Sequence, residues 1–114
     1  MRNHVQNVED KRELKEIVCR LIQAYEPEAV YLFGSQARGD AGPDSDYDLL
    51  LVVPDDAPRE RRRSRLAYET LWAAHARGAV DALVCTRSYF EARRHLKASL
   101  PGTVLREGRL LHAV

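Results

Sequence analysis

Apolar residues recur at helical spacing near the start of the chain. Residues three and four positions apart share one face of an α-helix, so the charged residues between them face the other way. The spacing predicts an amphipathic helix from Asp10 to Tyr25, and Pro27 is expected to end it. The apolar positions are Leu14, Ile17, Val18, Leu21, Ile22 and Tyr25.

Three short runs rich in β-branched and other apolar residues predict strands. They span Ala29 to Phe33, Asp46 to Val53 and Ala79 to Cys85. The stretch GSQARGDAGPDS between the first two runs is rich in glycine and is expected to form turns, with one helical turn at Gln36 to Arg38.

The segment between the second and third strands has a largely helix-forming composition. It predicts a helix from Pro58 to Arg77, with Gly78 as its C-terminal cap. Trp72 lies at helical spacing with Leu71 and His75, and we interpret it as a core residue.

The last quarter of the chain predicts two more helices and a strand. Ser88 and Glu91 have the spacing of an S-x-x-E capping box, which predicts a helix to about Ala98. A short helix is expected from Pro101 to just before Gly108, and the following RLLHA can form an edge strand.

The composition is that of a globular domain of 114 residues. The net charge of +1 gives no field that would indicate nucleic acid or an anionic membrane as the main partner. No apolar stretch approaches the roughly 20 residues of a membrane span, and the N-terminus lacks a signal-peptide pattern. We therefore expect a cytoplasmic protein.

The cysteines and histidines show no metal-type spacing. Cys19 and Cys85 lie in apolar stretches and are interpreted as reduced core residues, without a disulfide. The histidines are scattered, and we expect ordinary surface or packing roles for them. They are His4, His75, His95 and His112.

Chemistry is indicated by two aspartates at the start of the second strand. Side chains two positions apart in a strand share a face, so Asp46 and Asp48 would lie side by side while Tyr47 points away. Such like charges repel, and a divalent metal such as Mg2+, which prefers oxygen ligands, can compensate them. Gly34 and Ser35 would form a tight turn whose backbone N–H groups and hydroxyl can hold phosphate.

Asp81 is a candidate third carboxylate, because it lies in a strand that is expected to be in the core. Alternatively, an aspartate at the start of a strand can face solvent or cap a neighbouring turn. The stretch DSDYD can likewise be only a polar turn that enters a strand.

GSQARGDAGPDSDYD resembles the G-S-x10-D-x-D signature of the DNA polymerase β-like nucleotidyltransferase superfamily. The short chain with SDYDLLLVV is similar to its minimal nucleotidyltransferases, the MntA-type antitoxins, over about residues 10 to 111. The resemblance implies the α/β (α+β) polymerase β-like nucleotidyltransferase fold, a small mixed β-sheet flanked by helices, with residues 1–114 as one minimal nucleotidyltransferase domain.

Position by position, the resemblance implies that Gly34 and Ser35 bind the triphosphate of ATP. It assigns two Mg2+ ions to the catalytic carboxylates, which are Asp46, Asp48 and Asp81. The implied reaction is in-line attack on the α-phosphorus, which expels pyrophosphate and leaves AMP or another nucleoside monophosphate on a hydroxyl. Asp81 would help to take the proton of that hydroxyl.

The implied partner is a HEPN-domain RNase toxin, whose tyrosine is modified and which forms a hetero-oligomer with its antitoxin. Membrane and nucleic acid are not expected as direct partners. The alternative is a non-catalytic antitoxin or adaptor that neutralises its partner by binding, but mutual repulsion of three acids argues against a purely structural role. A structural calcium site lacks the spacing of an EF-hand loop.

Two basic features have two interpretations each. Arg38, in the loop after Ser35, can contact the nucleotide or be simply solvated. The RERRRSR run of residues 59–65 opens a predicted helix, where cations oppose the helix dipole. It can bind an acidic partner, RNA or substrate phosphates, or it can form a solvated helix face.

Overall fold

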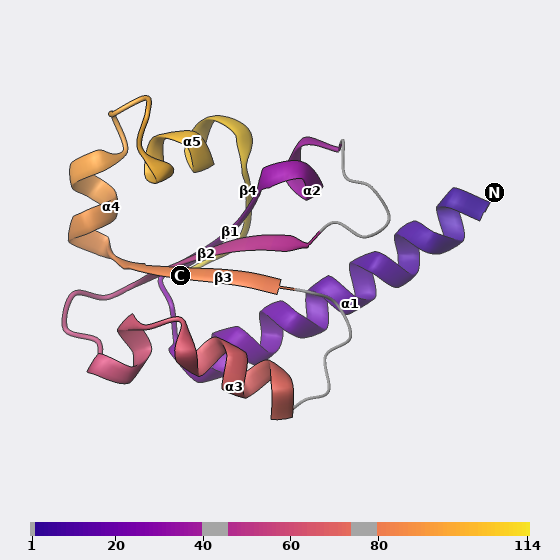
Figure 1. The fold of residues 1–114 in the computed structure, drawn as a ribbon, viewed down its shortest axis with the longest axis horizontal. Helices are drawn as coiled ribbons and strands as arrows, with labels where there is room; N and C mark the ends of the chain where they lie inside the picture. Colours follow the sequence, from indigo (N-terminus) through magenta and orange to yellow (C-terminus); the bar gives the residue numbers. More distant parts are fainter. Residues whose placement is uncertain (1, 40–45, 74–79) are drawn as a thin grey trace.

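The computed structural model describes residues 2–39, 46–73 and 80–114. Within these ranges the chain alternates helices with the four strands of one sheet (Figure 1). The elements are α1 (Arg2–Tyr25), β1 (Ala29–Phe33), α2 (Gly34–Arg38), β2 (Tyr47–Val53), the 3-10 helix η1 (Arg59–Arg62), α3 (Arg65–Ala73), β3 (Val80–Thr86), α4 (Arg87–Arg93), α5 (Leu100–Glu107) and β4 (Arg109–Ala113).

The sheet is mixed, with the strand order β3-β2-β1-β4. β1 pairs antiparallel with both β2 and β4, whereas β2 and β3 run parallel. α1 and α3 cover one face, and α4 and α5 cover the other (Figure 1). This arrangement confirms the predicted small mixed sheet flanked by helices.

β2 is buried on both faces because helices cover both sides of it. Its odd-numbered residues, from Tyr47 to Val53, pack in the larger core with α1 and α3. Leu50 and Val52 pack in the smaller core with Phe90 of α4 and Val104 of α5. The two-sided burial explains why this strand is an almost unbroken apolar run.

The predicted strands are confirmed within a residue. β1 has the predicted bounds, β2 begins at Tyr47 and β3 is shifted to Val80–Thr86. β4 forms the expected edge strand beside β1. The first helix begins at Arg2, well before the predicted Asp10, and its outer part projects beyond the sheet (Figure 1). A membrane span needs a long apolar helix, and none of the helices in the described ranges is one.

The predicted long helix after Pro58 is wrong, because the segment divides into η1 and α3. The break is fixed by Tyr25 of α1, whose hydroxyl donates to the Arg63 carbonyl (2.5 Å) and accepts from the Ala67 N–H (2.8 Å). This buried phenol takes up backbone groups that a continuous helix would use itself. The predicted cap at Gly78 lies outside the described residues.

The predicted capping box is also wrong. Thr86 caps α4, and its hydroxyl oxygen accepts from the Tyr89 N–H at 3.3 Å. Ser88 instead donates its N–H (2.9 Å) and its hydroxyl to Asp55, in the loop after β2. A tertiary partner has therefore replaced the local one. α4 also ends at Arg93, before the predicted Ala98.

Two predicted core residues lie at the surface instead. Trp72 is 85% exposed, because α3 turns this position away from the sheet. Cys19 is exposed on α1, while the free Cys85 is half-buried, and burial raises its pKa to about 11. Of the histidines, His95 is exposed and His112 is partly buried, and the side chains of His4 and His75 lie outside the described part.

Candidate active site

Asp48 and Asp81 lie directly opposite each other where the parallel strands β2 and β3 begin. In β2, Tyr47 is buried in the core with α1, so its neighbour Asp48 points to the other face, as predicted. Leu83 pairs with Leu50 on that same face. Asp81, two residues before Leu83, therefore shares the face of Asp48. The parallel register thus brings together two acids that are far apart in the sequence.

Gly34 packs against the carboxylate of Asp48. It has a left-handed backbone conformation with φ of +73°, which side-chain-bearing residues rarely adopt. A Cβ atom at this position would overlap Oδ2 of Asp48. The turn after β1 therefore comes this close to the acid only because residue 34 is glycine. The next residue, Ser35, is partly buried, and its hydroxyl has no hydrogen-bond partner within the described ranges.

The electrostatic setting of Asp48 is unfavourable for a second negative charge. Burial raises its pKa, and the nearby charges of Asp81 and then Asp46 raise it further, while Arg38 opposes the change. Asp46 lies just before β2 and is exposed. The other two predicted acids therefore act electrostatically on Asp48, and a further cation beside Asp48 would relieve the repulsion.

Among the described residues, no three His, Cys, Asp or Glu side chains lie close enough to hold one metal ion together. Mg2+ usually needs only one or two carboxylates, together with substrate phosphates and water. The neighbouring Asp48 and Asp81 carboxylates fit that kind of site. The metal roles of Asp46, Asp48 and Asp81 remain predictions.

Asp81 was predicted to lie in the core, but it is exposed. β3 is one of the two edge strands of the sheet, so one side of Asp81 is open. The alternative interpretation, an aspartate that faces solvent near the start of its strand, describes its exposure correctly.

Tyr68 is a residue of this site that the sequence did not indicate. From α3, its hydroxyl donates to Oδ1 of Asp81 at 3.2 Å. Burial raises the pKa of Tyr68, and its hydrogen bond to Asp81 and the charge of Asp81 raise it further. No motif or spacing links a helical tyrosine with an aspartate thirteen positions later. Only the packing of α3 beside β3 brings them together.

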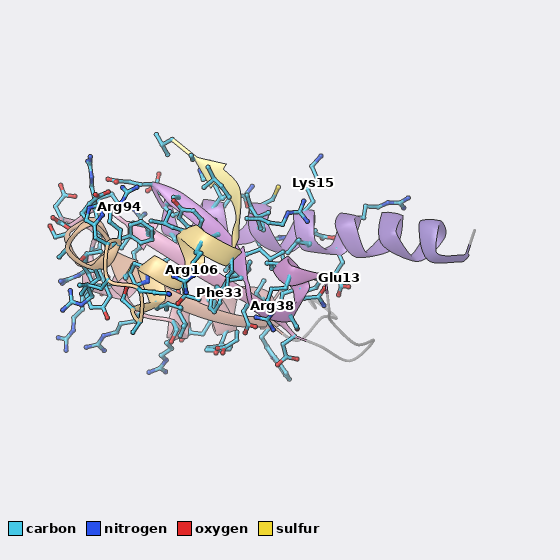
Figure 2. All side chains as sticks on the ribbon, turned by 90° about the horizontal axis from the view of Figure 1, so that it is seen from above. Glu13, Lys15, Phe33, Arg38, Arg94 and Arg106 are labelled. Carbon is cyan, nitrogen blue, oxygen red and sulfur yellow. The ribbon has the colours of Figure 1, made fainter. Side chains whose placement is uncertain are left out.

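Arg38 lies at the end of α2, near enough to Asp48 to lower the pKa of that acid. Its Nη1 atom is 3.9 Å from Oε1 of Glu107, which also pairs with Arg106. Figure 2 shows Arg38 and Arg106 on the same side of the molecule. Arg38 is therefore positioned beside the acids, and its contact with a nucleotide stays a prediction.

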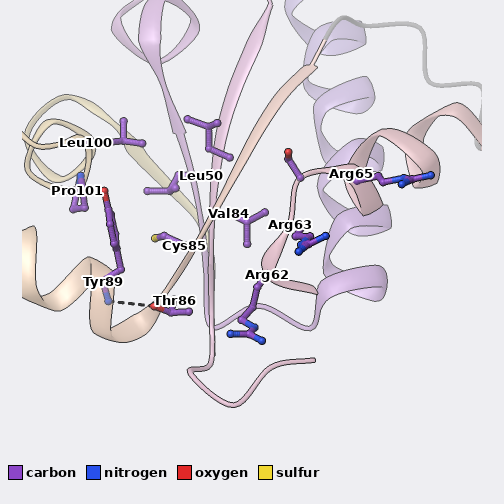
Figure 3. A pocket seen from close by; sticks show the side chains of 12 residues that line it. Leu50, Arg62, Arg63, Arg65, Val84, Cys85, Thr86, Tyr89, Leu100 and Pro101 are labelled. Atoms are coloured by element: carbon purple, nitrogen blue, oxygen red, sulfur yellow. Dashed lines mark hydrogen bonds between the residues drawn. The ribbon is translucent and has the colours of Figure 1, made fainter. Parts of the chain in front are cut away.

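The arginines of residues 59–65 belong to a different region. Arg61 forms an ion pair with Glu26 (2.5 Å), and Arg65 with Glu69 (2.9 Å). Arg62 and Arg63 border an open groove of about 840 Å³ at the later part of β3 (Figure 3). None of the predicted catalytic acids lines this groove. Its other lining residues are mostly apolar and include Leu50, Leu83, Val84, Leu100 and Pro101, but Ser64, Arg65, Thr86 and Tyr89 also border it.

Comparison with protein families gives a match to the nucleotidyltransferase domain over residues 11–110. A search among functionally curated proteins finds no match.

Solved structures with the same fold include a Sulfolobus solfataricus protein assigned as a nucleotidyltransferase. It is 26% identical, with a TM-score of 0.59 over 90% of this chain and 78% of that chain. A toxin–antitoxin structure with AMP-PNP is 23% identical, with a TM-score of 0.57 over 87% and 73% of the two chains.

A third similar structure is that of a tri-AMPylated Shewanella oneidensis HEPN toxin in complex with MNT antitoxin. Its matching chain is 19% identical, with a TM-score of 0.55 over 91% of this chain and 72% of that chain. At these identities the two toxin–antitoxin structures support the fold alone.

Proposed function

This chain belongs to the nucleotidyltransferase domain family, and we propose that it transfers AMP, or another nucleoside monophosphate, from a nucleoside triphosphate to a hydroxyl of a partner protein. The observation that carries the proposal is the contact between Gly34 and Asp48, with Asp81 opposite Asp48 in the register. This contact supports the proposal because the segment predicted to bind phosphate packs against Asp48, one of the acids predicted to bind metal.

Each residue of the site has a role in this proposal. Gly34 and Ser35 hold the triphosphate through backbone N–H groups and the Ser35 hydroxyl, and Asp46, Asp48 and Asp81 hold two Mg2+ ions. Bound Mg2+ would supply charge neutralisation at the phosphates and the attacking oxygen. Asp81 accepts the proton of the acceptor hydroxyl, and Arg38 adds positive charge beside the nucleotide.

The proposed acceptor is a tyrosine of a HEPN-domain toxin, which makes this chain the antitoxin of a cytoplasmic toxin–antitoxin pair. Support comes from the similar structures, which include a toxin–antitoxin structure with AMP-PNP and a tri-AMPylated HEPN toxin with its MNT antitoxin. We expect a separate protein to bring the acceptor hydroxyl.

The test is incubation of the chain with labelled ATP, Mg2+ and a candidate HEPN-domain partner. We expect the partner to be labelled, and Asp48→Asn to lower the rate at least about 100-fold, since it removes a metal-binding charge. Asp55→Asn makes the same charge change at the other end of β2 and is expected to leave the rate unchanged.

Undiminished labelling by Asp48→Asn would refute the assigned site. A partner that is inhibited while its intact mass stays unchanged would support the alternative, neutralisation by binding alone.

A further inference from the structure

Tyr68 presents a phenolic hydroxyl at the carboxylate that is expected to serve the acceptor. Its oxygen lies 3.2 Å from Oδ1 of Asp81, and its side chain remains 49% exposed. α3 packs against α1, on the opposite face of the sheet from Asp81. Because β3 is an edge strand, the hydrogen bond from Tyr68 to Asp81 joins groups from the two sides of the sheet at this edge.

We propose that Tyr68 is itself an acceptor, and that the chain nucleotidylates this tyrosine when no partner hydroxyl occupies the site. The inference rests on the proposed function, because it uses the same donor and the same acids. It adds a modification site on the chain itself.

The step is a phosphoryl substitution at the α-phosphorus of the nucleoside triphosphate. The Tyr68 oxygen forms a bond to this phosphorus while the bond to the β-phosphate oxygen breaks, so pyrophosphate leaves with the bonding electron pair. The phenolic proton passes to Asp81, its present hydrogen-bond acceptor, and from there to water. The product is a phosphodiester between tyrosine and nucleoside, with no change of oxidation state.

The other four tyrosines do not meet these conditions. Tyr25 and Tyr47 are buried in the core, and Tyr31 is partly buried and stacks on Phe90. Tyr89 is nearly as exposed as Tyr68, at 44%, but it lies on α4 and lines the groove at the later part of β3 (Figure 3). Tyr89 is therefore a matched control for Tyr68.

The modification would regulate the site. A nucleotide attached to Tyr68 would stand beside Asp81 and obstruct a partner's hydroxyl. Self-modification would then hold the enzyme inactive until the phosphodiester is removed.

The test is incubation of the purified chain alone with ATP and Mg2+, followed by intact-mass measurement and peptide fragmentation. We expect a mass increase of one AMP group, located on Tyr68. The increase should be absent in Tyr68→Phe and Asp48→Asn and present in Tyr89→Phe. A thermal shift with ATP and Mg2+ shows whether Tyr68→Phe still binds the nucleotide.

The outcomes separate this inference from the proposed function. If the wild-type chain labels its partner but gains no mass itself, the self-modification is refuted and the transferase stands. AMP on any residue other than Tyr68 also overturns the inference. If neither protein is labelled, both proposals fail.

Discussion

Two aspartates at opposite ends of β2 experience opposite environments. Asp48, near the start of the strand, has a raised pKa because it is partly buried and faces Asp81 and Asp46. Asp55, just beyond the end, has a lowered pKa because the Ser88 hydroxyl and backbone N–H donate to it. The charge of Asp55 is matched by donors within the fold, whereas repulsion from its neighbours disfavours that of Asp48.

The difference distinguishes an acid that the fold itself stabilises from one that we propose to bind a ligand. Asp55 stabilises the start of α4 through bonds that the fold already makes. Asp81 and Asp46 disfavour the charge of Asp48, Arg38 offsets this only in part, and a bound cation would relieve the remaining repulsion. A cluster of unfavourably placed charges beside a close backbone turn is therefore evidence for a ligand site.

Substitution of Gly34 is expected to have the largest effect on stability. In Gly34→Ala the left-handed backbone alone costs about 1–2 kcal/mol, and overlap with Asp48 adds to this and displaces the acid. Urea unfolding measures the loss, and partner labelling should fall with it.

The matched control is Gly39→Ala. Gly39 has a similar φ of +83°, but a Cβ there would meet nothing within 4 Å. It should carry the backbone cost alone and retain transfer. Equal losses of transfer in both variants would contradict the importance of the contact between Gly34 and Asp48.

Addition of Mg2+ should stabilise the folded chain through Asp48 and not through Asp55. At ten times its dissociation constant, Mg2+ that binds only the folded chain raises the free energy of unfolding by about 1.4 kcal/mol. We expect thermal unfolding to show this rise in the wild type and in Asp55→Asn, and to show little of it in Asp48→Asn. A full rise in Asp48→Asn would place the ion elsewhere.

The pH dependence of stability should have opposite signs at the two ends. For Asp48, the folded chain binds more protons than the unfolded chain at pH values between 3.8, the ordinary pKa of an aspartate, and the raised pKa of the folded state. The contribution of Asp48 to the free energy of unfolding is therefore complete below pH 3.8 and is lost as the pH rises through the pKa of the folded state. For Asp55, the unfolded chain binds more protons between the lowered pKa and 3.8, so its contribution is present above 3.8 and is lost as pH falls.

Urea unfolding from about pH 3 to about pH 7, without metal, tests both signs. Asp48→Asn should remove the decline on the high side of this window, and Asp55→Asn should remove the rise on the low side. The same change in both variants would show that the two acids are equivalent.

The smallest expected effect is a difference in thiol reactivity between the two cysteines. Burial raises the Cys85 pKa from 9.0 to about 11, so its thiolate fraction at neutral pH is about 100-fold lower than that of an ordinary thiol. Cys19 is exposed and should be alkylated first by iodoacetamide, as peptide mass spectrometry would show. If Cys85 were alkylated faster than Cys19, the groove beside Cys85 would be more open to solvent than its packing indicates.

Local patterns were sufficient where one segment decides its own structure. The apolar run of β1 and the turn residues after it predicted this part of the fold closely. The same reasoning failed where a distant group intervened. Asp55 engages Ser88, and Tyr25 holds the backbone at Arg63 and Ala67, and neither contact has a signal in the local sequence.

The sequence by itself determined the chemistry available to this protein: the glycine and serine of the turn, the paired acids after it and the family to which they belong. The tertiary structure decided which groups meet. It set the register that places Asp81 opposite Asp48, brought Tyr68 against Asp81, and left Trp72 in solvent. The physical reason is that periodicity fixes which face of an element a side chain occupies, while packing between elements fixes what that face meets.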